Sequence, residues 1–525
     1  MSNEANAHLR HGLEGLSAER LKGMRRGLEK ESLRSHPDGT LALSPHPSAL
    51  GSALTHPHIT TDFSESQLEL VTGAYATPEA VLEELTRLHQ FTYRVLQQQG
   101  DELLWVSSMP CVLPADEAIP IAQYGSSNVG HAKSVYRMGL SHRYGRRMQT
   151  ISGIHYNWSL PGLSNDEYFG LIRNFRRHAF LLLYLFGASP ALCESFVEGR
   201  QHELQPLPGS MHMPHGTSLR MGRLGYQSDA QASLAVSYNC LEGYAASLQD
   251  ALTRPYPAYE ALGLRGPGGE YQQLATTLLQ IENEFYGTIR PKRTIFPGER
   301  PLHALRERGV EYVEVRLMDL DPFVPVGIEA STMRFLDLFL LHCLLSPSPP
   351  DHPAEIAALA RNQHRTAARG REPGLMLERE GREQSLVDWG AELLEAFEPL
   401  AQRLDADLAG TPLAGAHAQA LAQARERLAR PELLPSARVL DAMAQGPGTS
   451  FIHFACERSR QAREDLLALP LSAEHEAQLR AQSQTSVREQ QRIESLDSLP
   501  FELYRQQYTS PQRLGRPRSP TVQAV

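Results

Sequence analysis

An alternation of apolar and charged residues at residues 311–318 (EYVEVRLM) sets the strongest constraint on how this chain can fold. Its β-branched and aromatic content and its period of two predict a β-strand. Val313, Val315 and Leu317 would occupy one face of this strand, and Glu314 and Arg316 the other. Antiparallel strands with helices packed on one face fit this pattern better than regular βαβ alternation, so we predict an α+β fold.

The charged face of this strand has two interpretations. Glu314 and Arg316 could form only a local ion pair. They could also place a metal ligand beside an arginine that clamps a phosphate or a carboxylate.

A second stretch, GLEKESLR at residues 27–34, places Glu29 and Glu31 two positions apart. On a strand, both carboxylates would share one face, and Leu28 and Lys30 would share the other. A solvated strand face with Lys and Arg partners is the ordinary explanation. Residues 150–160 (TISGIHYNWSL) also predict a strand, on which His155 is either a structural residue or part of a metal site.

The segment TTDFSESQLELVTG, residues 60–73, predicts a short helix capped by Thr61 or Asp62. On such a helix, Asp62, Glu65 and Glu69 would form one acidic stripe. A solvated helix face is the default interpretation, because like charges in a row repel unless solvent or a cation intervenes.

The chain changes character at LSPSPPDHP, residues 345–353. Before it, FRRHAFLLLYLFG predicts a core helix that ends at Gly187. After it, the chain is rich in Ala, Leu, Glu, Arg and Gln at helical spacing. We therefore predict an α+β core at residues 1–345, a helical part packed on it at residues 354–508, and a disordered tail at residues 509–525.

Composition excludes several classes of protein. The net charge of −9 argues against a general nucleic-acid binder, and the longest apolar run is too short to span a membrane. The five cysteines are widely spaced and form no CxxC pair, and the first residues contain no apolar signal core, so we expect a reduced, cytoplasmic protein. The sequence contains neither GxGxxG nor GxxxxGK[ST], so neither common nucleotide-binding fingerprint applies.

Arg and Tyr residues suited to gripping a small carboxylate occur in SVYRMGL, TSLRMGRLGY and IENEFYGTIRPKR, namely Tyr136, Arg137, Arg220, Tyr226 and Tyr286. The run RPKR, residues 290–293, could meet phosphates. Several hard oxygen ligands, an arginine beside one of them and nearby basic groups suit ATP held by divalent metals and an acid that is phosphorylated.

A series of short segments from about residue 21 to residue 327 resembles, in the same order along the chain, the proteobacterial type of glutamate–cysteine ligase. They include RGLEKESLR, HPSALGSALTHPHITTDFSESQLELVT, AQYGSSN, RYGRRMQTISGIHYNWSLP, LQIENEFYGTIRPKR and GVEYVEVRLMDLDPF. The resemblance implies a glutamine-synthetase-like curved antiparallel sheet with packed helices and metal-bound ATP at one end. It continues more loosely through the helical part.

The resemblance also implies residue roles. It places six residues around Mg²⁺, or Mn²⁺ in its place: Glu29, Glu31, Asp62, Glu69, His155 and Glu314. It gives Glu314 and Arg316 catalytic roles, with Arg316 at the transferring phosphate or the γ-carboxylate. It sets five residues around the amino-acid acceptor: Tyr136, Leu140, Arg220, Tyr226 and Tyr286. Lys292 and Arg293 would contact the ATP phosphates, and Glu65 receives no role.

The implied activity is ATP-dependent ligation of the glutamate γ-carboxylate to cysteine through γ-glutamyl phosphate, the first step of glutathione synthesis. The implied partners are small-molecule substrates, with no nucleic acid or membrane, and the protein is expected to be a monomer. The alternatives are a paralogous ligase that joins glutamate to another amine, a non-catalytic regulatory protein, and a metal-dependent phosphohydrolase. The dependence of ADP release on the added amine separates these alternatives.

Overall fold

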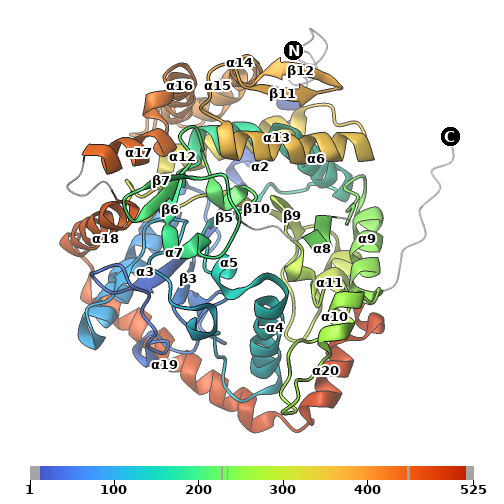
Figure 1. Cartoon of the computed structure of the whole chain (residues 1–525). Helices are drawn as coiled ribbons and strands as arrows, with labels where there is room; N and C mark the ends of the chain where they lie inside the picture. The colour runs from blue at the N-terminus through green and yellow to red at the C-terminus, as the bar shows by residue number, and fades with distance from the viewer. Residues whose placement is uncertain (1–11, 226–228, 233, 446–449, 516–525) are drawn as a thin grey trace, which may run out of the picture.

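The computed structural model describes residues 12–225, 229–232, 234–445 and 450–515. At its centre lies an antiparallel sheet with strand order β2-β3-β1-β5-β10-β9, and the short β4 pairs with the end of β1 (Figure 1). The strands are β1 (Arg25–Ser35), β2 (Ile59–Thr61), β3 (Gln67–Val71), β4 (Leu103–Leu104), β5 (Ile154–Ser159), β9 (Ile289–Lys292) and β10 (Tyr312–Met318). The strands predicted around residues 27–34, 150–160 and 311–318 are confirmed, and so is the α+β class.

One face of the sheet is apolar and carries the main core. Leu28 pairs across β1 and β5 with Tyr156, which pairs with Val315 on β10. All three side chains are fully buried. The helices α3 (Pro78–Gln99) and α6 (Asn165–Phe186) pack on strands of this sheet, and α12 (Ala330–Leu345) packs on both helices. Because these helices cover the apolar face, the alternate residues of the same strands are left for the polar face.

The long helix α6 shows how local sequence sets its limits. Ser164 and Glu167 form a reciprocal capping box at its start, which satisfies backbone donors that have no helical partner. Its last turn ends at Gly187, as predicted, where the glycine N–H binds the Leu183 carbonyl. The apolar run at residues 179–188 is buried in the core. No helix within the described ranges is both long and apolar enough to cross a membrane.

The helix predicted after Thr61 or Asp62 is wrong, because residues 59–71 form a β-hairpin instead. The turn is built locally: Ser64 accepts a hydrogen bond from the Ser66 N–H, and the Gln67 N–H binds the Ser64 carbonyl. In β3, Leu68 and Leu70 then face the core and Glu69 faces the other way. The acidic helical stripe therefore does not exist.

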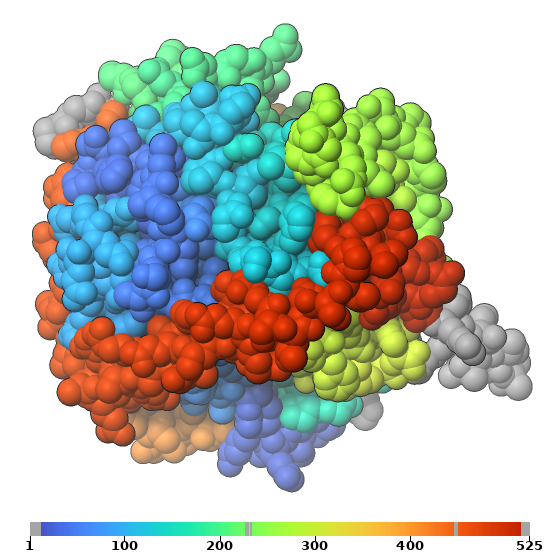
Figure 2. Space-filling model, turned by 90° about the horizontal axis from the view of Figure 1, so that it is seen from below, coloured from blue at the N-terminus to red at the C-terminus, as the bar shows by residue number. Residues whose placement is uncertain are grey.

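Residues 353–509 are mainly helical, but they also contain the hairpin of β11 (Met376–Arg379) and β12 (Arg382–Ser385). The helices are α13 (Pro353–Arg369), α14 (Leu386–Ala396), α15 (Glu398–Ala406), α16 (Ala416–Ala429), α17 (Pro435–Gln445), α18 (Phe451–Ala468), α19 (Ala473–Leu496) and α20 (Phe501–Thr509). The red band in Figure 2 is the end of this segment, where α19 contacts α3 and α20 contacts α4 (Asn128–Tyr144). The predicted division of the chain between residues 345 and 354, into an α+β core and a helical part, stays a prediction. The helices of the second part pack closely on the first.

The start of the predicted disordered tail is ordered. Residues 511–514 form a 3-10 turn, in which Leu514 is buried and its carbonyl accepts a hydrogen bond from Arg306. The expectation of disorder is therefore wrong for residues 509–515. Residues 516–525 lie outside the described part of the chain.

Shorter elements complete the chain around this frame. The helices are α2 (Ala18–Lys22), α5 (Arg146–Gln149), α7 (Glu194–Val197), α8 (Asp229–Ala232), α9 (Leu241–Thr253), α10 (Pro257–Leu262) and α11 (Pro301–Arg308). A second small sheet has the order β6-β8-β7, with β6 (Ala191–Cys193), β7 (Gln205–Leu207) and β8 (Ser210–His212).

A buried ion pair on the apolar face ties the sheet to a helix. Arg26 on β1 donates to Asp337 on α12 at 2.7 Å, and the Tyr156 hydroxyl donates to the other carboxylate oxygen at 2.8 Å. We expect Asp337→Ala to lower the free energy of unfolding by about 3–5 kcal/mol, because it leaves the Arg26 charge buried without a counter-charge. Thermal denaturation followed by circular dichroism measures this. Glu83→Gln, which removes one partner of an exposed ion pair within α3, is the matched control and should leave the melting temperature nearly unchanged. Equal melting temperatures for the two variants would contradict the assignment.

Candidate active site

The polar face of the sheet gathers carboxylates through strand register. Glu31 on β1 lies directly opposite Glu69 on β3. Glu29 on β1 lies opposite His155 on β5. Residues that face each other in an antiparallel pair project to the same side, so these side chains meet above one surface.

His155 stands at the centre of this group. Its Nδ1 atom lies 3.0 Å from Glu29 Oε2 and 3.9 Å from Glu314 Oε1, and its Nε2 atom lies 3.6 Å from Glu31 Oε1. Burial, and then the nearby Arg316, lower the pKa of His155, so the imidazole is neutral. With its Nδ1 proton donated to Glu29, it keeps a free lone pair on Nε2.

Two carboxylates on the β1 and β3 side are compensated only in part, because the charges of Arg220 and Arg316 near Glu31 and of Arg137 near Glu69 do not offset burial. Burial, and next the charge of Asp62, raise the pKa of Glu31 to about 8, although the Gly153 N–H donates to its Oε2 atom at 2.7 Å. Burial together with the charges of Glu29, Asp62 and Glu31 raises the pKa of Glu69 well above its ordinary value. A cation placed among these oxygens would remove this penalty.

The donor set suits a hard divalent cation. One ligand atom each from Glu29, Glu69 and His155 lies within 4.8 Å of the other two. The Oδ1 atom of Asn157 is also buried here without a hydrogen-bond partner, while its Nδ2 atom donates to Glu29 at 2.9 Å. Mostly oxygen ligands with one imidazole fit Mg²⁺ or Mn²⁺ better than they fit zinc. The residues present therefore fit the predicted metal.

The opposite side of the polar face is positively charged. Glu314 on β10 binds Lys292 Nζ at 3.0 Å and Arg316 Nη1 at 3.0 Å. Burial disfavours the Glu314 carboxylate, but Lys292 and Arg316 hold its pKa well below its ordinary value. Arg290, the cross-strand neighbour of Glu314, adds a third cation, which is buried. The polar face thus runs from excess negative charge at β3 to excess positive charge at β9.

A cavity of about 370 Å³ opens beside the positive side, and Arg220, Tyr286 and Arg316 line it. Arg220 is fully buried and donates to the Arg316 carbonyl at 2.7 Å. Gln149 donates to the Tyr286 hydroxyl at 2.8 Å. The far wall comes from α6 and from α13, so the helical part contributes to the site.

Two predicted acceptor residues, Tyr136 and Leu140, lie on α4. Leu140 packs with Phe63 in the turn of the β2–β3 hairpin, and Tyr136 packs against the same group. Arg137, between them, donates to the Asp62 carbonyl and stacks on the Tyr124 ring at 4.6 Å. This helix therefore connects the acidic hairpin to the predicted acceptor pocket.

Some predicted residues are not brought to this site. Arg293 contacts Glu311 and the Arg308 carbonyl, away from the carboxylates. Glu65 accepts hydrogen bonds from the backbone N–H groups of His46 and Gln123, so it holds loops, in agreement with its lack of a predicted role. Tyr226 lies outside the described residues.

Sequence reasoning missed Asn157, Arg290 and Gln149 as site residues. Asn157 could have been found, because it is two positions from His155 on the same strand face. Arg290 was seen only as part of a basic run, although it is two positions from Lys292 on β9. Nothing local to Gln149 shows its contact with a residue 137 positions away.

Comparisons with known proteins agree with this geometry. The family model for glutamate–cysteine ligases matches residues 13–366. A glutamate–cysteine ligase of Alcanivorax borkumensis is 46% identical over 515 residues, covering 94% of this chain and 97% of that protein. One of Janthinobacterium sp. (strain Marseille) is 49% identical over 511 residues, covering 93% and 95%. The crystal structure of a glutamate–cysteine ligase from Francisella tularensis in complex with AMP has a TM-score of 0.87 at 35% identity, covering 94% of this chain and 98% of that one.

The chain belongs to the glutamate–cysteine ligase family. The resemblance of the ordered segments is thereby confirmed, as are the ligase class and the fold that it implied. The roles of the individual site residues stay predictions, supported by the distances and charges above.

Gly153 gives this site a test of close packing. A Cβ atom at Gly153 would lie 2.1 Å from Arg220 Nη2, so no side chain fits unless the guanidinium moves. We expect Gly153→Ala to lower ligase activity at least ~10-fold, because a displacement of about 1 Å in a binding group can cost ~10²-fold. Steady-state ADP release measures this. Gly170→Ala in α6, where a Cβ meets atoms no closer than 3.7 Å, is the control and should keep full activity. Full activity of Gly153→Ala would show that the position of Arg220 does not matter.

Proposed function

We propose that this chain uses ATP to phosphorylate the γ-carboxylate of glutamate on the polar face of the sheet and then joins the γ-glutamyl group to cysteine. The observation that carries the proposal is the strand register, which sets Glu29, Glu31 and Glu69 beside Glu314 and Arg316 on one surface. Family membership supplies the reaction class.

The first step forms one bond and breaks one. A γ-carboxylate oxygen of glutamate attacks the γ-phosphorus of ATP, and ADP leaves, which gives γ-glutamyl phosphate. Both reactants are anions, so the protein must neutralise their repulsion. Lys292 and Arg316 lie on the positive side of the face, and Glu314 fixes both cations by 3.0 Å contacts.

A divalent cation would be held by Glu29, Glu69 and His155, with Glu31, Asp62 and Glu314 around them. Such an ion supplies neutralisation of the ATP phosphate oxygens and keeps them oriented for transfer. Neutral His155 fits a ligand role, because its Nδ1–H donates to Glu29 and leaves Nε2 free.

In the second step the neutral cysteine amine attacks the acyl-phosphate carbonyl and forms the C–N bond. Phosphate leaves with the C–O bond electrons and takes up the proton that the amine loses. We place the acceptor between α4, which carries Tyr136 and Leu140, and the cavity, which Tyr286 and Arg220 line. Arg220 would offer a cation to the acceptor carboxylate. The reaction needs no protein nucleophile. The four described buried cysteines accordingly have no catalytic role.

Small molecules are the substrates of this reaction. A cytoplasmic location and a monomeric state complete the proposal, and the free thiols of all five cysteines agree with a reducing compartment.

The dependence of ADP release on cysteine tests the function. With Mg²⁺, ATP and glutamate present, we expect cysteine to raise ADP release strongly and γ-glutamylcysteine to accumulate in equal amount. ADP release without any amine would indicate a phosphohydrolase. A stronger response to another amino acid would indicate a paralogous ligase.

Glu69 tests the metal assignment with a readout that does not depend on activity. We expect Mn²⁺ or Mg²⁺ to raise the melting temperature of the wild type by mass action and to raise that of Glu69→Gln much less. We also expect the variant to lose ~10²-fold in activity, as when other electrostatic stabilisers of a transition state are removed.

Glu65→Gln is the matched control, because it changes a carboxylate in the same hairpin that binds only backbone N–H groups. It should keep the metal-dependent rise in melting temperature. An unchanged rise in Glu69→Gln would remove that carboxylate from the metal site.

A further inference from the structure

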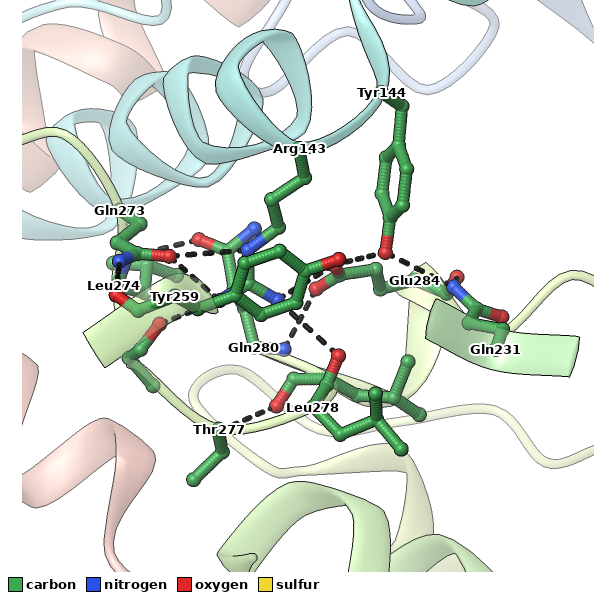
Figure 3. A network of polar contacts seen from close by, with 12 residues as sticks. Arg143, Tyr144, Gln231, Tyr259, Gln273, Leu274, Thr277, Leu278, Gln280 and Glu284 are labelled. Atoms are coloured by element: carbon green, nitrogen blue, oxygen red, sulfur yellow. Dashed lines mark hydrogen bonds and ion pairs between the residues drawn. The ribbon is translucent and has the colours of Figure 1, made fainter. Parts of the chain in front are cut away.

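The buried carboxylate of Glu284 lies just outside the proposed acceptor pocket. It ends the 3-10 turn at residues 282–284, two positions before Tyr286, and is fully buried. Its Oε1 atom accepts hydrogen bonds from Arg143 Nη1 at 2.8 Å and from the Tyr144 hydroxyl at 2.7 Å. Its Oε2 atom accepts from the Gln280 backbone N–H at 2.6 Å. Figure 3 shows these groups converging from α4 and from the 273–284 segment.

The charge on Glu284 is matched by an arginine whose donors are all used. Arg143 donates to the Gln273 side chain from Nε and Nη2, to the carbonyls of Leu278 and Ala275, and to Glu284 (Figure 3). Its guanidinium also stacks on the Tyr259 ring at 3.9 Å. An arginine with five fixed partners has one allowed orientation, so it fixes Glu284 in turn.

From Glu284, one branch of contacts leads to Tyr286. Gln231 donates to the Tyr144 hydroxyl at 3.1 Å and to the Glu284 carbonyl at 2.9 Å. The Gln231 side-chain oxygen accepts the backbone N–H of Tyr286 at 3.1 Å. The Tyr144 ring also meets the Tyr286 ring edge-to-face, with centroids 5.5 Å apart. Glu284 therefore fixes both the backbone and the ring of Tyr286 through two neighbours.

The other branch leads to Tyr136. Gln280, whose backbone N–H binds Glu284, donates from its side chain to the Tyr136 carbonyl at 3.3 Å. Its side-chain oxygen accepts the Leu274 N–H at 2.9 Å, which fixes the amide orientation. Gly139 lets this amide approach α4, since a Cβ there would lie 2.2 Å from the Gln280 oxygen. Glu284 thus reaches the helix that carries Tyr136.

We propose that Glu284 is a positioning residue that sets the distance and orientation between Tyr136 and Tyr286 and thereby controls recognition of the amino-acid acceptor. This rests on the proposed function, in which both tyrosines line the acceptor pocket. A gain in stability does not explain the Arg143–Glu284 ion pair well. A buried ion pair is often no more stabilising than apolar residues of the same volume. The carboxylate itself makes all its hydrogen bonds with protein groups, so it acts through its neighbours.

The test replaces Glu284 with its neutral isostere. In Glu284→Gln, an amide N–H₂ group stands where an oxygen accepted hydrogen bonds, so one branch of contacts must rearrange. We expect kcat/KM for cysteine to fall about 10-fold or more, since displacements near 1 Å can cost ~10²-fold. The KM values for ATP and glutamate should stay within about twofold of the wild type, because the phosphoryl-transfer residues lie on the sheet.

Glu282→Gln is a matched control from the same 3-10 turn. Glu282 is also a buried carboxylate paired with an arginine, Arg300, at 2.6 Å, but its contacts lead to the start of α11. This variant should lower the melting temperature as Glu284→Gln does and leave kcat/KM for cysteine unchanged. An equal loss for cysteine in both variants, or none in Glu284→Gln, would overturn the proposal.

Tyr144→Phe is a second test in case Glu284→Gln fails to fold. It is a smaller change, because it removes only the hydroxyl that joins Glu284 to Gln231. We expect a smaller, cysteine-selective loss of about 3- to 10-fold, in the range of one lost hydrogen bond. Crystal structures of both variants should show Tyr286 displaced from its wild-type position. This readout holds even if the wild type proves not to use cysteine, which would refute the proposed function alone. Tyrosine positions identical to those of the wild type would refute the positioning role alone.

Discussion

The uneven distribution of charge on the polar face of the sheet is the constraint on which the rest of the structure depends. Glu31 and Glu69 face each other across two strands, and Glu29 lies two residues from Glu31. Buried carboxylates this close repel, so the strands that carry them must be held by something else. The apolar face does this: Leu28 on β1 begins a buried row that continues through Tyr156 and Val315. On β3, Leu68 and Leu70 are buried on the same face. Because side chains alternate along a β-strand, the same sheet can carry repelling carboxylates on its polar face and pack a core on its apolar face.

Glu314 lies where the acidic and the basic halves of the polar face meet. It faces His155 on one side and binds Lys292 and Arg316 on the other. In the proposed reaction two anions, a phosphate chain and a carboxylate, would meet there and would need positive charge from both directions. The basic half comes from β9 and β10, and in the acidic half Arg137 and Arg220 offset the buried carboxylates only in part. A divalent ion on the β1 and β3 side would supply positive charge from the second direction. The donor set and the reaction class therefore point to the same metal.

The sequence predicted this site where the signal was the strand period and failed where it was not. Residues 311–318 and 27–34 alternate over enough positions to fix both their structure and their polar faces. β3 has five residues, and the spacing of Asp62, Glu65 and Glu69 happens to match a helix, so the hairpin was misread. The period also ends with β9 at Lys292, which is why the next residue, Arg293, turns to other partners. Gln149 and Glu284 carry no local signal, because the side chains they bind, Tyr286 and Arg143 respectively, lie more than 130 positions away.

The two halves of the reaction ask different things of the protein, and the architecture separates them. Phosphoryl transfer needs charges at fixed points, which a sheet supplies through register. Choosing among amino acids is harder, because one small group more or less changes binding by only ~1–3 kcal/mol in an apolar pocket. Selectivity then depends on how rigidly the pocket keeps its shape. Tyr286 follows a turn and Tyr136 lies on α4, so neither is fixed by the sheet. A buried arginine–carboxylate pair, Arg143 with Glu284, is stiff because every one of its groups must keep a partner. A polar network under the proposed acceptor pocket therefore fixes the shape of the pocket at some cost in stability. An apolar core at the same place would not fix that shape.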